Sequence, residues 1–154
     1  MKILIADDHD LVRETLAAFL ERETDIDVYT SEDLQSATAQ IRKDGPFDLV
    51  LLDYTMPGMN GLTGLETAIK INENHPVALM SGTAPKAIAQ KALDLGAIGF
   101  LPKTMGAKSL INAVRFMAAG DVYAPVKFMT EDSNEELNPL AKGLSARELQ
   151  VLGG

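Results

Sequence analysis

The strongest fold signal in this chain is Phe47-Asp48-Leu49-Val50-Leu51-Leu52-Asp53-Tyr54-Thr55-Met56-Pro57-Gly58-Met59-Asn60-Gly61. Its apolar run, residues 49–52, is too short for a helix and lies between turn signals, as is typical of a strand buried on both faces. Asp53 ends this run, and a loop rich in proline and glycine follows. A lone aspartate at this position would more simply be explained as a residue that ends the strand and caps the turn. A functional role for Asp53 therefore depends on other residues of the chain.

Other apolar runs also end in a polar residue. The amino-terminal run ends in the acidic pair Asp7 and Asp8, the run before residue 81 ends in Ser81, and the run after residue 97 delivers Lys103. The carboxyl ends of parallel strands border the crevice in which open α/β sheets bind ligands. We therefore expect these groups to share one pocket with Asp53.

Between these runs, apolar residues recur at helical spacing, for example at Val12, Leu16, Phe19 and Leu20. Alternating strands and helices predict an α/β fold with a parallel sheet covered by helices on both faces. The expected helix starts are capped by Asp10, Ser31 and Thr104, and another helix is expected to start at Thr83 and Pro85.

The pair Asp7-Asp8, together with Asp53-x-x-Met56-Pro57-Gly58-Met59-Asn60-Gly61, resembles the receiver (CheY-like) domain of bacterial two-component response regulators. The resemblance covers residues 1–120. It implies a three-layer, doubly wound, parallel five-stranded sheet of order 2-1-3-4-5.

The same resemblance implies roles for individual residues. Asp53 would be the phosphoacceptor, and Mg²⁺ would be held by Asp7, Asp8, Asp53 and a backbone carbonyl near Thr55, which is an oxygen set that suits this ion. Ser81 and Lys103 would assist the phosphoryl transfer. Ser81 and Phe100 would form the switch, with Phe100 turning from an exposed to a buried rotamer after phosphorylation.

The implied function is that of a phosphoacceptor switch rather than a conventional enzyme, catalysing only its own phosphorylation and slow dephosphorylation. The implied partners are a sensor histidine kinase and, after phosphorylation, a second copy of the chain. The implied location is cytoplasmic.

The chain changes character after residue 120. Residues 121–143 are acidic, include Pro125 and Pro139, and are expected to form a linker. Residues 144–154 carry Ser145 and Glu148 at capping-box spacing. They resemble the start of the helix-turn-helix output domain of the NarL/FixJ (LuxR-type) class. The sequence stops before a recognition helix, so we expect a truncated output domain and no specific DNA binding by this chain.

Three alternatives remain at this point. A phosphohydrolase of the haloacid dehalogenase type would need an acid two residues after the nucleophile, where this chain has Thr55. A flavodoxin-like cofactor binder would need a hydroxyl-rich phosphate loop after the first strand, and the chain also has no tryptophan to stack on a flavin. A receiver that signals without phosphate would not need the intact set of acids and Lys103.

The amino-acid composition excludes further classes of protein. The net charge of −8 argues against nucleic-acid binding, and no apolar run approaches the roughly 18 residues of a membrane span. With no cysteine, disulfides and thiolate metal sites are excluded. His9 is expected at the rim of the pocket rather than as a metal ligand. Because a cis bond before a non-proline residue costs about 3–4 kcal/mol, we expect a trans Lys103–Thr104 bond.

Overall fold

Strands and helices alternate strictly along the part of the chain that the computed structural model describes, residues 1–82 and 86–124. Thr83, Pro85 and the expected output segment lie outside these residues, as does most of the expected linker. In chain order the elements are β1 (Lys2–Ala6), α1 (Asp10–Glu21), β2 (Asp27–Ser31), α2 (Leu34–Asp44), β3 (Leu49–Asp53), α3 (Thr63–Ile71), β4 (Val77–Ser81), α4 (Lys86–Asp94), β5 (Gly99–Pro102) and α5 (Ala107–Ala118).

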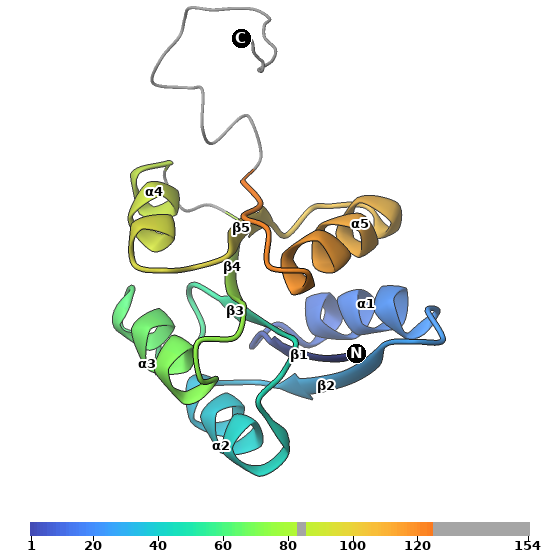
Figure 1. The fold of residues 1–154 in the computed structure, drawn as a ribbon, viewed down its shortest axis with the longest axis horizontal. Helices are drawn as coiled ribbons and strands as arrows, with labels where there is room; N and C mark the ends of the chain where they lie inside the picture. Colours follow the sequence, from blue (N-terminus) through green and yellow to red (C-terminus); the bar gives the residue numbers. More distant parts are fainter. Residues whose placement is uncertain (83–85, 125–154) are drawn as a thin grey trace, which may run out of the picture. The chain divides into compact units, whose positions relative to one another are not determined.

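The five strands form one parallel sheet of order β2-β1-β3-β4-β5. Figure 1 shows α1 and α5 on one side of this sheet and α2, α3 and α4 on the other. The expected three-layer, doubly wound α/β fold and its strand order are confirmed. No helix within residues 1–82 and 86–124 is long and apolar enough to cross a membrane.

The central strands are apolar because both of their faces are covered. Every residue of β3 and β4 is buried. Side chains of a strand alternate between its faces, so every second residue joins the same layer. The layer beneath α1 and α5 is built from Ile3, Ile5, Leu49, Leu51, Leu16, Leu20, Leu110, Val114 and Met117, among others.

The expected caps of the first two helices are wrong. Asp10 is the first residue of α1 rather than its cap, and its carboxylate accepts a hydrogen bond from Arg13. Ser31 ends β2, where its carbonyl accepts from the Asp7 N–H at 3.0 Å. Asp33 caps α2 instead, by accepting from the Ser36 N–H at 2.7 Å. Pairing with β1 thus keeps Ser31 in the strand.

The turn from β5 into α5 differs in part from expectation. Among the described residues, the cis peptide bond is the one between Gly45 and Pro46. The Lys103–Thr104 bond is therefore trans, which confirms the expectation. Thr104 does not cap α5, because Gly106 occupies the cap position without a side-chain hydrogen bond. The Lys103 N–H donates to the Ser81 carbonyl at 3.3 Å. This bond holds the lysine beside β4, and α5 begins at Ala107.

The chain returns to the sheet after α5. Tyr123 forms a parallel bridge with Gly99, its N–H donating to the Ile98 carbonyl at 2.8 Å and its carbonyl accepting from the Phe100 N–H at 3.1 Å. The first compact unit accordingly comprises Met1–Ala124, which is four residues past the boundary expected from the sequence.

Candidate functional site

Three acidic side chains meet at the carboxyl edge of the sheet. β1 and β3 are adjacent and parallel, so the residues at their carboxyl ends lie together. Asp7 and Asp53 are fully buried there, whereas Asp8 is partly exposed. One potential ligand atom from each of these acids and one from His9 lie within 4.8 Å of one another.

Lys103 supplies a positive charge to the buried acids. Its Nζ lies 3.0 Å from Asp53 Oδ2 and 3.1 Å from Asp7 Oδ2, and it donates a hydrogen bond to Asp7 Oδ1 at 3.3 Å. The lysine side chain is itself only 12% exposed. Buried carboxylates are stable only when they are paired or bind a cation, so one ammonium group serves two acids.

The surroundings keep Asp53 ionised. Burial is the largest influence and acts to raise its pKa, but the Lys103 ammonium, the Thr55 N–H and the neighbouring Asp8 carboxyl together hold that pKa below its usual value. The pKa of Asp8 is instead raised, first by burial and then by Asp53. Asp53 therefore keeps its charge to lower pH than Asp8, and a charged carboxylate is the form that acts as a nucleophile.

Thr55 fixes the orientation of this carboxylate. Its backbone N–H and its hydroxyl Oγ1 each donate to Asp53 Oδ1 at 3.2 Å. Asp53 Oδ2 is left facing Lys103. One oxygen is thus used for positioning, and the other lies in the shared acidic cluster.

Ser81 lies at the wall of the site, but Phe100 does not. A cavity of about 370 Å³ opens beside the acids and is lined by His9, Val12, Thr55, Ser81, Gly82 and Lys103. Phe100 lies within β5, pairs with Leu79 of β4, and is fully buried. The ring therefore already has the buried orientation that the resemblance assigns to the phosphorylated state.

His9 lines the cavity with a 59% exposed side chain, in agreement with the expected rim position, and its Nδ1 lies 3.1 Å from Asp7 Oδ1. Arg13 was not expected from the sequence. Arg13 donates from Nη1 to the Asp7 carbonyl and from Nη2 to Asp10 Oδ1, both at 2.7 Å. The spacing of Asp10 and Arg13, three residues apart on a helix, is a signal that could have identified the second of these contacts.

The donor set fits a hard divalent cation. Carboxylate oxygens from three acids converge, and oxygens are the ligands that Mg²⁺ prefers. Among the residues that the structure describes, Asp7 Oδ2 and Asp53 Oδ2 are buried without a hydrogen-bond partner, at ion-pair distance from Lys103. Both oxygens thus have coordination capacity left.

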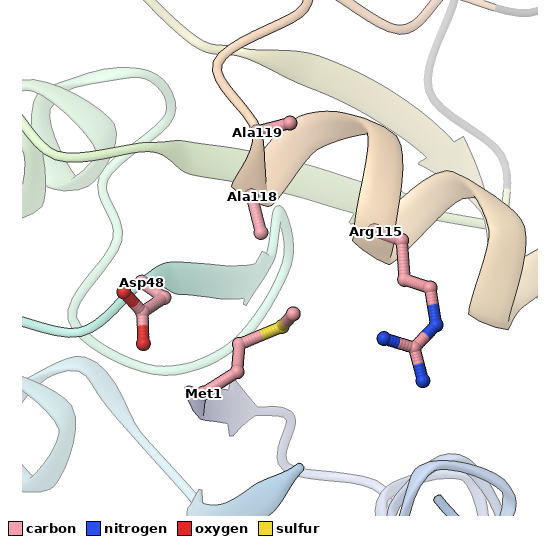
Figure 2. Close-up of a pocket in the computed structure, with 5 residues that line it drawn as sticks. All are labelled: Met1, Asp48, Arg115, Ala118 and Ala119. Carbon is pink, nitrogen blue, oxygen red and sulfur yellow. The ribbon is translucent and has the colours of Figure 1, made fainter. Parts of the chain in front are cut away.

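A cavity of about 380 Å³ lies at the other end of the sheet, near the start of β1 (Figure 2). It is lined by Met1, Asp48, Arg115, Ala118 and Ala119. The Arg115 guanidinium is bound by Glu23 and Asp25 at 2.7 and 2.8 Å. The charge of Arg115 is thus already paired with two exposed or half-exposed carboxylates.

Comparison with known proteins agrees with this geometry. The profile of the response regulator receiver domain matches residues 3–115. The chain is 36% identical to the glycerol metabolism activator of Pseudomonas putida, over 80% of this chain and 57% of that protein. It is 34% identical to the transcriptional regulatory protein NarL of Mycobacterium tuberculosis, over 99% of this chain and 72% of that protein. The chain spans a little over half to about three quarters of these curated relatives.

Solved structures show the same relationship. The signal receiver domain of NarL from Mycobacterium tuberculosis superposes with a TM-score of 0.70 at 34% identity, covering 77% of this chain and 96% of that one. A LuxR family DNA-binding response regulator from Silicibacter pomeroyi gives a TM-score of 0.71 at 32% identity, covering 81% and 97%. This chain belongs to the response regulator receiver family, and within that family to the NarL/LuxR class.

Proposed function

We propose that Asp53 accepts a phosphoryl group and that the resulting acyl phosphate switches the domain. The observation that carries this proposal is the convergence of an ionised, buried Asp53 with Lys103 and two further acids. An aspartate carboxylate attacks phosphorus, the bond to the donor's leaving group breaks, and an acyl phosphate remains.

The main barrier to this reaction is charge repulsion. Two like unit charges about 4 Å apart repel by roughly 4 kcal/mol at a protein surface, and the incoming phosphoryl group meets three acids. Asp7, Asp8, Asp53 and the Thr55 carbonyl would hold Mg²⁺, which would neutralise this charge. Catalysis would then consist largely of positioning and electrostatic stabilisation.

Lys103 and Ser81 would act on the transferred group. The lysine ammonium, now 3.0 Å from Asp53 Oδ2, is placed to bind a phosphoryl oxygen as a point charge. Ser81 lines the same cavity and would donate its hydroxyl to a second oxygen. Phosphorylation adds roughly −1.5 to −2 of charge and three acceptor oxygens, which would draw the end of β4 towards the site.

Ser81 and Phe100 would transmit this change through adjacent strands. β4 and β5 are paired, with Ser81 opposite Pro102 and Leu79 opposite Phe100. A movement at the end of β4 therefore reaches β5 directly. The proposal also includes an exposed rotamer of Phe100 in the unphosphorylated protein, which would turn to the buried orientation after phosphorylation.

The proposed donor is a sensor histidine kinase, and the proposed output is transcriptional control through a DNA-binding domain that follows the receiver. The curated relatives include transcriptional regulators that extend beyond the matched region. A linker at 121–143, an output domain starting near residue 144 and dimerisation of the phosphorylated form belong to the same proposal. The cytoplasmic location stays a prediction.

The test is incubation with acetyl phosphate and Mg²⁺, followed by intact mass measurement. The parent protein and Asp94→Asn, which removes an exposed acid on α4, should each gain one phosphoryl group. Asp53→Asn should gain none. Undiminished labelling of Asp53→Asn would refute the proposal, and rapid multiple turnover of the donor would favour a phosphohydrolase.

A further inference from the structure

The imidazole of His9 lies at the edge of the acidic cluster, with one nitrogen turned towards the acids. Its Nδ1 is 3.1 Å from Asp7 Oδ1, 3.3 Å from Asp8 Oδ1 and 3.7 Å from Asp53 Oδ2. The ring is on the loop between β1 and α1, and its side chain is 59% exposed. One nitrogen therefore approaches all three acids while the rest of the ring faces solvent.

These separations match those between ligands of one metal ion. Ligand atoms about 2.1 Å from an octahedral ion are about 3.0 Å apart when adjacent and about 4.2 Å apart when opposite. The 3.1 and 3.3 Å distances from His9 Nδ1 are close to the adjacent separation, and the 3.7 Å distance lies between the two values. A cation placed among the carboxylates would consequently have Nδ1 within reach after little rearrangement.

The backbone of His9 favours this position. His9 is extended (φ −91°, ψ 106°), and its N–H donates to Asp7 Oδ1 at 2.8 Å. Arg13 holds the Asp7 carbonyl at 2.7 Å. The loop that carries the imidazole is thus tied to the same aspartate whose carboxylate it approaches.

Both neutral tautomers of His9 are compatible with the contacts. With the proton on Nδ1, the ring donates to Asp7; with the proton on Nε2, the Nδ1 lone pair faces the Lys103 ammonium, 3.2 Å away. The second tautomer presents a lone pair to a cation, which is the arrangement that a metal ligand needs. The competing explanation is a histidine that only donates a hydrogen bond to Asp7.

We propose that His9 Nδ1 is a direct ligand in the cation site and shifts its preference from Mg²⁺ towards borderline transition-metal ions such as Co²⁺. This inference rests on the metal site of the proposed function. Imidazole nitrogen suits transition metals, whereas an all-oxygen set suits Mg²⁺. The ring therefore contributes selectivity, and the carboxylates contribute most of the affinity for Mg²⁺.

The experiment measures binding of Mg²⁺ and Co²⁺ separately, by titration calorimetry on the full chain. Loss of even an outer-shell partner typically weakens metal binding by about 10–100-fold, so His9→Ala should weaken Co²⁺ binding by at least about 10-fold. Its Mg²⁺ affinity should stay close to that of the parent. His9→Gln, which keeps a polar side chain, should behave in the same way if His9→Ala folds poorly.

The chain has two histidines, so His75 provides a matched control. Its Nδ1 lies 3.1 Å from the Asn72 carbonyl, after α3 and before β4, at the amino edge of the sheet. His75→Ala should leave the affinities for both ions unchanged. In proton NMR with Co²⁺, a hyperfine-shifted imidazole N–H should appear in the parent and in His75→Ala and disappear in His9→Ala.

Equal Co²⁺ affinity in the parent and His9→Ala, or the same loss for both ions, would overturn the inference. So would the absence of a shifted imidazole signal. A different result would refute the phosphoacceptor proposal, namely phosphorylation of the Asp53→Asn variant by acetyl phosphate. Labelling confined to Asp53, with no effect of His9→Ala on Co²⁺, would remove the inference and leave the proposed function intact.

Discussion

Lys103 Nζ lies 3.0 Å from Asp53 Oδ2, although β4 separates the strands that carry the two residues. The lysine spans this strand from the end of β5, and the same ammonium also contacts Asp7. A single cation therefore joins the ends of β1, β3 and β5. This contact makes the site a property of the whole sheet edge rather than of one loop.

Removing that ammonium should slow phosphorylation without abolishing the nucleophile. We expect Lys103→Gln to lower the rate of labelling by acetyl phosphate by about 10²-fold, as is typical when one stabilising donor is lost. The measurement is the time course of adduct formation by mass spectrometry. Lys108→Gln removes an exposed lysine of α5 and should leave the rate unchanged. Equal rates in the two variants would contradict the role of Lys103.

Arg13 should act through the loop that carries the acids. Because it holds the Asp7 carbonyl, Arg13→Gln should weaken Mg²⁺ binding by about 10-fold, the effect expected when a ligand loses its outer support. Arg13→Lys keeps a donor and should recover part of the affinity. Arg22→Gln, at the other end of α1, is the control. A loss of thermal stability with unchanged Mg²⁺ affinity would indicate a purely structural role.

Stability in acid should depend on Arg115. Its guanidinium is the largest influence lowering the pKa of Asp25 from 3.8 to about 2. A carboxyl whose folded pKa is depressed stabilises the fold above its unfolded pKa, and this contribution disappears as the pH falls through the folded value. The Tm of the parent should exceed that of Arg115→Gln above pH 3.8, with the difference shrinking towards pH 2.

Both partners are exposed enough for salt to screen the pair, so added salt should also reduce this difference. Arg42→Gln on α2 removes the same charge at an exposed position and serves as the control. A difference in Tm that is constant from pH 5 to about pH 2 would show that Arg115 stabilises by packing alone.

Gly99 should be intolerant of a side chain. A Cβ there would lie 2.7 Å from the Tyr123 carbonyl oxygen and 2.5 Å from Met117 Sδ. The sulfur can move, but the backbone oxygen accepts from the Phe100 N–H. We expect Gly99→Ala to destabilise the domain by about 1–3 kcal/mol in urea unfolding, because the contact is overpacked.

Hydrogen exchange provides the specific readout for Gly99→Ala. The Phe100 amide should exchange faster if the bridge to Tyr123 has opened. At Gly82, which is not the cap of a described helix, an added Cβ meets nothing within 4 Å, so Gly82→Ala should leave both stability and Phe100 exchange unchanged. Unaltered Phe100 protection in Gly99→Ala would show that the close approach is relieved elsewhere.

Much of the fold could be predicted because its signals are local. The apolar run before Asp53 and its counterparts predict the strands, and the motif around Asp53 leads to the family and hence to the strand order. The cost of a cis bond correctly predicts the trans Lys103–Thr104 link. Each of these depends on neighbouring residues or on a motif read within one stretch.

The contacts that were missed join residues distant in sequence. The buried amide of Asn72 accepts from the Phe47 N–H at 2.7 Å and donates to its carbonyl at 3.2 Å. Similarly, pairing with β1 retains Ser31 in β2, although its residue type favours a cap. The contacts of His9 with Asp53 and Lys103 were missed for the same reason, because both partners lie far along the chain.

The bridge of Tyr123 to Gly99 has a consequence for self-association. β5 is an outer strand, and the unpaired backbone groups of an outer strand are a template for intermolecular β-pairing and aggregation. At this edge the Ile98 carbonyl and the Phe100 N–H are already bonded to Tyr123. A strand from a second molecule would have to displace that segment before it could add to the sheet. The segment that carries Tyr123 therefore protects the β5 edge of the sheet against edge-to-edge polymerisation.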